Sequence, residues 1–227
     1  TGSNAEQGFT GAIRYVTSEV TPTVYFTEDH DEIDMDYEYK NLKNYLERNN
    51  YLVKKLNLIS TDKIPEDAEL VIIASPKKDI TMAEREVLAE YLDNGGKALF
   101  MFDYLANDPS FDEFNKLFSK YNVEINYDKV KETDENRCLP NDPNTIVLDV
   151  KSNSIFPQSF RTLISNSRSV SILKNEKEYV KTTSLMATSD KAVGEMVSKE
   201  RGNDLKGPLD IAVAVEYTGG TKASRII

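Results

Sequence analysis

Two short apolar runs, each next to an amphipathic segment, constrain the fold more than any other feature of this sequence. Residues 70–74 read LVIIA and residues 97–102 read KALFMF. Runs of this length without polar alternation are typical of strands buried on both faces, as in a parallel sheet. Parallel strands need long crossover connections, which are usually helices. The runs therefore predict an α/β fold: a mostly parallel sheet with helices on both faces.

The segments around these runs alternate as such a fold requires. Strands are expected at residues 24–27 and 51–58, and helices at residues 36–49 and 109–121. The second of these helices carries Phe111, Phe114, Phe118 and Tyr121 at the spacing of one helical face. Asp34 or Asp36 is expected to cap the first, because free N–H groups and the helix dipole favour an acid there.

A third helix has the clearest end signals in the chain. Thr81 and Glu84 have the spacing of a capping box, in which each side chain accepts a hydrogen bond from the other residue's backbone N–H. The sequence DNGG at residues 93–96 ends the helix, with Gly95 or Gly96 free to adopt the left-handed conformation of a C-cap. This segment links the two apolar runs and is expected to be the crossover between them.

The chain divides into four segments on this interpretation. Residues 1–20 are a tag remnant and lead-in, and residues 21–121 are the α/β core. Residues 122–208 carry short β-like runs between polar loops and are expected to be a β-rich excursion. Residues 209–227 return to the core sheet. Because SNA near the start resembles a cloning scar and KASRII reads as the beginning of a strand, we expect the chain to be part of a larger protein.

Composition excludes several classes of partner and cofactor. The formal net charge is −10 and no cluster of Lys and Arg is present, which argues against nucleic acid and against anionic membrane surfaces. No window has the roughly 18 apolar residues of a membrane span. Cys138 is the single cysteine, so neither an internal disulfide nor a zinc site built on cysteines can form. No cofactor is predicted.

The stretch TVYFTEDHDEIDMDYEY at residues 23–39 holds the single histidine, His30, among six acids. A calcium loop starting at Asp34 would place Tyr39 where the turn glycine belongs and Tyr45 where the bidentate acid belongs. A transition-metal site would want more than one imidazole or thiolate. We therefore predict no metal site, and expect a solvated loop between a strand and a helix.

Five residues are candidates for binding because they lie at predicted strand ends. In open α/β sheets, ligands bind at the carboxyl ends of the strands, and Glu28, Ser75 and Asp103 are expected there. His30 and Glu32 follow the first strand directly. No glycine-rich phosphate loop is present. Ser75 lacks the flanking glycines of a nucleophile elbow, so a hydrolase using Ser75 and His30 is only an alternative.

Three segments resemble a known family. They are GAIRYVTSEVTPTVYFTEDHDE, DAELVIIASPKKDITMAEREVLAEYLDNGGKALFMFD, and PLDIAVAVEY with KASRII. Together they are similar to the auxiliary component of an uncharacterised ABC transport system, the GldG-like group first named for gliding motility. The resemblance covers most of residues 10–104 and the last twenty residues. Members usually read GHGE after the first strand; here the sequence is DHDE, so His30 and Glu32 match and both glycines are replaced by Asp.

The resemblance implies an extracytoplasmic, non-enzymatic domain whose parent protein is anchored by membrane helices. It would work with the ATPase and permease subunits of an ABC transporter, through protein contacts or ligand capture. The implied fold is similar to flavodoxin-like and class I glutamine-amidotransferase-like domains, without their catalytic cysteine. Two alternatives stay open: a small-molecule or carbohydrate-binding module, and a serine hydrolase or amidotransferase relative that uses Ser75 and His30.

Overall fold

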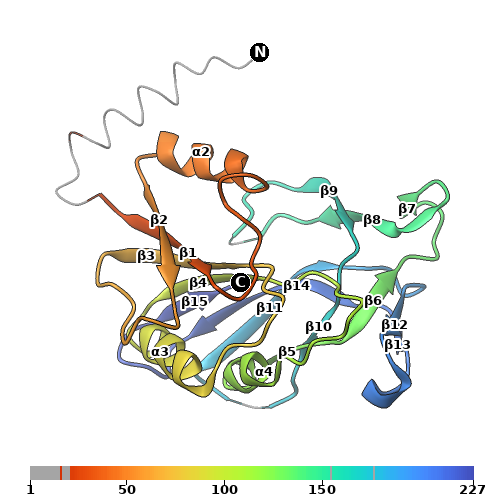
Figure 1. Cartoon of the computed structure of the whole chain (residues 1–227). Coiled ribbons are helices and arrows are strands. Elements are labelled where there is room, and N and C mark those ends of the chain that lie inside the picture. The colour runs from red at the N-terminus through yellow and green to blue at the C-terminus, as the bar shows by residue number, and fades with distance from the viewer. Residues whose placement is uncertain (1–15, 17–20, 154, 176) are drawn as a thin grey trace.

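The computed structural model describes residue 16 and residues 21–227 except 154 and 176 (Figure 1). The prediction for residues 1–20 therefore lies outside the described residues, apart from Val16. The elements in chain order are β1 (Thr23–Glu28), α2 (Lys40–Arg48), β2 (Leu52–Asn57), β3 (Ala68–Ala74), α3 (Met82–Asp93), β4 (Lys97–Met101), α4 (Asp112–Ser119), β5 (Val123–Ile125), β6 (Asp128–Lys131), β7 (Cys138–Leu139), β8 (Asp142–Val150), β9 (Phe160–Ser165), β10 (Val170–Ile172), β11 (Val180–Ala187), β12 (Val193–Met196), the 3₁₀ turn η1 (Lys199–Arg201), β13 (Leu205–Lys206), β14 (Asp210–Tyr217) and β15 (Ser224–Ile226).

The main sheet is mixed, which corrects the expectation of a mostly parallel one. Its strands follow the order β2-β1-β3-β4-β15-β14-β10-β5, with β11 paired to the other side of β14. The pairs from β2 to β15 are parallel, whereas β15–β14, β14–β10, β10–β5 and β14–β11 are antiparallel. Beyond β4 the neighbouring strands β14 and β15 are joined by a short turn rather than by a helix, and a short turn can only reverse the chain.

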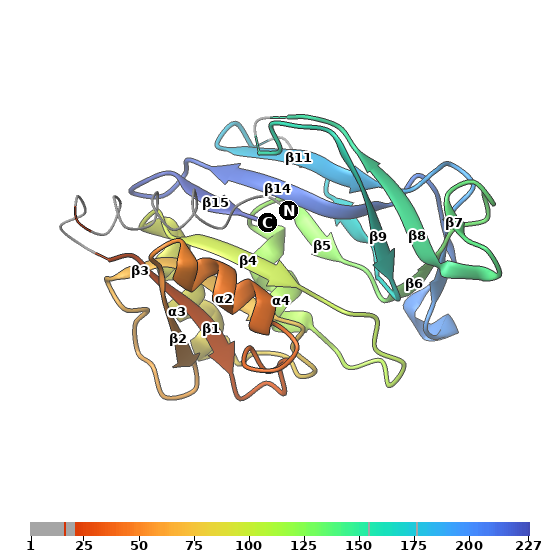
Figure 2. The ribbon, with the colours of Figure 1, turned by 90° about the horizontal axis from the view of Figure 1, so that it is seen from above.

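The two faces of the parallel half are packed differently. On one face, Tyr25, Val71 and Ile73 share a core with Leu88 of α3 and Phe114 of α4. On the opposite face, the alternate residues of β1 and β3 pack against the partly buried apolar side chains of α2. Further along this second face, the β8–β9 hairpin covers the antiparallel strands (Figures 1 and 2). One helix and a hairpin thus cover the face that the sequence predicted to be covered by helices.

Helix boundaries agree with the sequence where side chains cap them and differ where they do not. The capping box of α3 is confirmed, since Thr81 and Glu84 each accept the other's backbone N–H. Gly95 takes the predicted positive φ, at +88°. The capping role of Asp34 or Asp36 is wrong: α2 begins four residues later than predicted, after Tyr39, and no side chain caps it. A run of turns fills that interval.

Helix α4 begins after Phe111, which has no side chain suited to capping. Asp79, from the loop before α3, supplies the cap instead: its two carboxylate oxygens accept the N–H groups of Glu113 and Phe114 at 2.7 and 3.1 Å. Burial raises the pKa of Asp79, although these hydrogen bonds oppose the shift. The cap therefore ties the loop at 75–81 to the start of α4, and the loop's position follows from the core packing of that helix.

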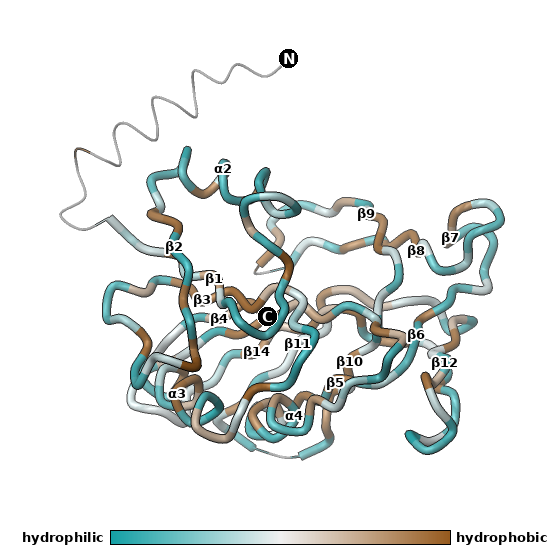
Figure 3. The backbone as a smooth tube through the Cα atoms, viewed as in Figure 1, coloured by the Kyte–Doolittle hydropathy of each residue, from teal (hydrophilic) through white to brown (hydrophobic). Residues whose placement is uncertain are grey.

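The segment 122–208 does not stand apart from the sheet. Its strands β5, β10 and β11 extend the main sheet, and β6–β9, β12 and β13 form two small sheets of three strands each. Strands β14 and β15, from residues 209–227, lie in the middle of the main sheet. Apolar residues concentrate along the strands and polar residues along the loops (Figure 3). In the described part of the chain, no helix has the length and apolar content of a membrane span.

Candidate functional site at the carboxyl ends of the strands

Two loops meet at the carboxyl ends of β1 and β3, and backbone hydrogen bonds join them. The Ile33 N–H donates to the Ala74 carbonyl at 3.0 Å, and the Lys77 N–H donates to the His30 carbonyl at 2.8 Å. Ser75 adopts a positive φ of +54°, and its N–H donates to the Met101 carbonyl at 2.8 Å. The loops after two neighbouring parallel strands are thus held as one unit, which positions His30.

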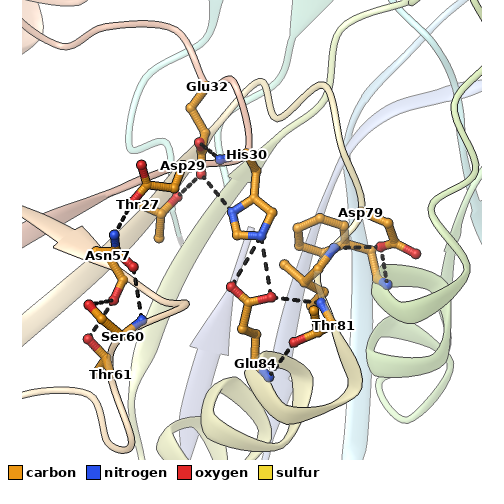
Figure 4. A network of polar contacts seen from close by, with 12 residues as sticks. Thr27, Asp29, His30, Glu32, Asn57, Ser60, Thr61, Asp79, Thr81 and Glu84 are labelled. Carbon is orange, nitrogen blue, oxygen red and sulfur yellow. Dashed lines mark hydrogen bonds and ion pairs between the residues drawn. The ribbon is translucent and has the colours of Figure 1, made fainter.

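His30 lies between two buried carboxylates (Figure 4). Its Nδ1 is 3.6 Å from Oε1 of Glu32, and its Nε2 is 3.1 Å from Oε1 of Glu84. The side chains of all three residues are at most 6 % exposed. Glu32 also accepts the Thr27 hydroxyl at 2.8 Å and the His30 N–H at 2.6 Å. The arrangement is a buried Glu–His–Glu group that links β1 to the N-terminus of α3.

The charges in this group stabilise one another. Burial lowers the pKa of His30, but the hydrogen bond and charge of Glu32, together with the charge of Glu84, outweigh burial and raise it above the ordinary value of 6.5. Burial raises the pKa of Glu32, but hydrogen bonds from His30 and Thr27 outweigh it and bring it below the ordinary value of 4.5. A cationic imidazole between two carboxylates is therefore the favoured state near neutral pH.

The stability of the fold should depend on pH through His30. A histidine whose pKa is raised on folding contributes its full stabilisation below its unfolded pKa, here 6.5, and loses it as pH rises through the folded pKa. Urea unfolding of the wild type should therefore show a midpoint that falls as pH increases above 6.5. In His30→Gln this part of the fall should be absent. Parallel profiles for the two proteins would contradict the assignment.

Ser75 and Asp103 lie apart from His30 and border a different space. Both line a cavity of about 420 Å³ that lies mostly among apolar side chains of β4, β14 and β15. Within the described residues, the polar contacts of the His30 ring are with Glu32 and Glu84 and not with Ser75. The pair that a serine hydrolase would need is thus not formed. Asp103 anchors a neighbouring loop, because its carbonyl accepts Nε–H of Arg168 at 2.9 Å.

Glu28 lies at the rim of a separate acidic surface. It lines a small cavity of about 220 Å³ together with Asp29, Asp31 and Glu32. Lys55 of β2 approaches this surface, with Nζ at 3.8 Å from Glu28 and at similar distances from Asp34 and Asp36. The five predicted residues therefore occupy three places. Among the residues that the structure describes, no group of three or more His, Cys, Asp or Glu side chains could hold a metal ion.

The two aspartates that replace glycines in DHDE keep a glycine-like backbone. Asp29 has a φ of +84° and Asp31 a φ of +56°. Both values lie in the left-handed region that glycine adopts freely and that Asp tolerates better than most residues. Side-chain contacts accompany these conformations, since Asp29 accepts from Asn57 and Asp31 pairs with Lys78 at 2.7 Å. The loop conformation that orients His30 is thus compatible with either residue type.

The comparison with known families covers most of the chain. A family model described as an ABC-type uncharacterized transport system matches residues 21–208. The chain belongs to this family. The match includes β1 with its DHDE loop, the crossover through α3, and most of the strands of the second half. The part of the resemblance that concerns an auxiliary transport component is confirmed, and the narrower likeness to the gliding-motility group stays a prediction.

Individual relatives of this transport-family chain show a shared fold. A mouse protein, "Intraflagellar transport protein 52 homolog", is 36% identical over 93 residues, which is 40% of this chain and 21% of that protein. The solved N-terminal domain of mmIFT52 superimposes with a TM-score of 0.63 at 21% identity, covering 90% of this chain and 84% of that one. A ThuA-like protein from Bacteroides uniformis has a TM-score of 0.50 at 12% identity, covering 92% and 83% of the two chains.

Sequence reasoning missed Glu84 as a partner of His30. The two residues are 54 positions apart, and Glu84 has an evident local role in the capping box. The capping box was the available signal: it places a carboxylate at the N-terminus of the helix that follows β3, at the same sheet edge as the loop after β1. Arg168 was also missed, because a single arginine in a polar loop has no pattern.

Proposed function

We propose that this domain is a non-catalytic auxiliary component of an ABC-type transport system, and that it acts on the extracytoplasmic face through protein contacts. The match of the family model to residues 21–208 carries this proposal. The geometry of His30 supports it, because both ring nitrogens contact carboxylates that also bind backbone or hydroxyl groups. A ring held in this way connects parts of the fold instead of facing a substrate.

Exposed apolar side chains give the proposed contacts a location. Tyr37 is 80% exposed, Tyr45 on α2 is 57% exposed and Leu52 on β2 is 48% exposed. Strand β2 is the edge of the main sheet, and α2 packs beside it. Aromatic and apolar groups of this kind are enriched in the cores of protein interfaces. The α2–β2 side is therefore the surface through which we expect the domain to bind a transporter subunit.

Cross-linking in cells tests the protein contacts. The full-length protein would be affinity-tagged in its source organism, cross-linked, purified and analysed for co-purifying ATPase and permease subunits. Both subunits are expected with the wild type, and Tyr45→Lys with Leu52→Lys should reduce their recovery several-fold. Leu163→Lys, at a residue of β9 that is 54% exposed, is the matched control and should not. Recovery of neither subunit with the wild type would contradict the proposal.

The location can be tested with the cysteine of this chain. Cys138 is partly exposed, so a membrane-impermeant maleimide should label it in intact cells if the domain faces outward. Cys138→Ser provides the background from any cysteine elsewhere in the protein. Labelling that needs lysed cells would place the domain on the cytoplasmic side and overturn that part of the proposal, without affecting the test of subunit contacts.

A further inference from the structure

The cavity of about 420 Å³ differs from a surface pocket in its relation to the main sheet. Its lining includes Phe118 and Ile125, which belong to the core on the side of α3 and α4. It also includes Tyr39 and Met101, which belong to the core on the side of α2, and Met186, which packs beneath the β8–β9 hairpin. The cavity therefore reaches both faces of the sheet. A space of this shape lies within the layer of strands, between β4 and β14.

Strand β15 leads directly into this space. Ile226 pairs with Ala98 of β4 and with Val215 of β14. One residue further, the Ile227 N–H donates to the Ala98 carbonyl at 3.0 Å, and the Ile227 carbonyl accepts the Phe100 N–H at 2.7 Å. Ile226 and Ile227 both line the cavity. The ladder between β15 and β4 is thus regular up to the point where the cavity begins (Figures 1 and 2).

The flanking strands set the length of the space. Because β14 runs antiparallel to β15 and Val215 faces Ile226, positions beyond Ile227 would face Val213, Ala212 and Ile211 in turn. The next residue, Asp210, already pairs with Val170 of β10. On the other side, the bridge between Asp103 and Ser167 closes the space after the end of β4. Three residues of extended chain fit between these limits.

We propose that this cavity is a strand position of the fold, and that its occupant is three apolar residues of extended chain that continue β15 from Ile227. The occupant would be parallel to β4 and antiparallel to β14. Its side chains would alternate between the two apolar faces, so the sequence that fits is a continuous run of β-branched residues. A chain continuing from Ile227 is favoured over a separate peptide because Ile227 already holds the entrance through two hydrogen bonds to β4.

The register also says which backbone groups are used. Ile227 turns its N–H and carbonyl toward β4, so the next residue turns toward β14 and the one after that again toward β4. The second added residue would then donate its N–H to the Phe100 carbonyl and accept the Phe102 N–H. Proline at that position has no N–H and would remove the first of these bonds. This gives a matched pair of extensions with the same length.

The test compares three proteins: the chain ending at Ile227, the same chain extended by Val-Val-Val-Ser-Gly, and one extended by Val-Pro-Val-Ser-Gly. The first extension is expected to raise the thermal midpoint by at least about 5 °C, since it buries three apolar side chains. The proline extension should give less than half of that rise. Amide hydrogen exchange at Phe102 should slow at least tenfold in the first extension only.

Two results would overturn the proposal. Equal midpoints for the two extensions would show that the space does not accept a hydrogen-bonded strand. Equal stabilisation of the unextended chain by free acetyl-Val-Val-Val-amide at millimolar concentration would show that a separate strand is the occupant instead. Neither result bears on the transporter contacts, because the α2–β2 side lies at the opposite edge of the parallel half of the sheet.

Discussion

Replacing Glu84 by alanine is expected to lower the free energy of unfolding by about 3–5 kcal/mol, since removing one partner from a buried ion pair leaves the other charge uncompensated. Nε2 of His30 is 3.1 Å from the Glu84 carboxylate, and the Glu84 side chain is 3% exposed. The same carboxylate accepts the Thr81 N–H at 2.7 Å. The substitution therefore removes the charge partner of His30 and one half of the α3 capping box together.

Matched variants separate these two contributions. Thr81→Ala removes the cap and leaves the charges, and should cost about 1 kcal/mol. Glu84→Gln keeps a side-chain oxygen for the Thr81 N–H but removes the charge, so its loss should be the larger of the two, about 2–3 kcal/mol. Urea unfolding at pH 6 measures all three. If Glu84→Gln were as stable as the wild type, the ion pair with His30 would not contribute to the fold.

Replacing Arg168 by alanine should have an effect of similar size, about 3–5 kcal/mol. Arg168 is 4% exposed. Its Nε–H donates to the Asp103 carbonyl at 2.9 Å, and its guanidinium lies 5.3 and 5.7 Å from the ring centres of Phe111 and Tyr127. Truncation would leave a cavity and remove both the hydrogen bond and the cation–π contacts, which are worth most when buried.

Lysine and a second arginine provide the controls for this prediction. Arg168→Lys keeps the charge but loses the planar group that contacts two rings and the Nε donor, so about half of the loss should remain. Arg161→Ala removes an arginine from the neighbouring strand β9 whose side chain is 70% exposed and pairs with Asp149 at 2.7 Å. Its loss should stay below about 1 kcal/mol. Equal losses for Arg168 and Arg161 would contradict the role assigned to Arg168.

The sequence predicted the parallel half of the fold well because its signals there are local. The buried runs LVIIA and KALFMF form β3 and β4, and the spacing of Phe111, Phe114 and Phe118 gives the buried face of α4. The capping box at Thr81 and Glu84 depends on residues three positions apart. Each of these patterns is set by the period of one element, so it can be recognised without knowing what packs against it.

The antiparallel half was harder to predict because pairing between short strands is a long-range property. Strands β5, β10 and β11 have three, three and eight residues, and nothing in such runs states which neighbour they join. Tertiary packing decided that they extend the main sheet. It also decided that α2 starts after Tyr39, since the acids at Asp34 and Asp36 interact with Lys55 and Lys43 instead of capping a helix.

By itself, the sequence determined that His30 and Glu32 follow the first strand of an α/β domain, and that Glu84 opens the helix after the third strand. These are statements about neighbours in the chain, which hydrophobic period and capping rules settle. Only the tertiary structure decided that the three side chains meet, because β1 and β3 are adjacent and parallel and their loops are joined at one sheet edge. A histidine that looked like part of an acidic loop is thereby a buried cation between two carboxylates.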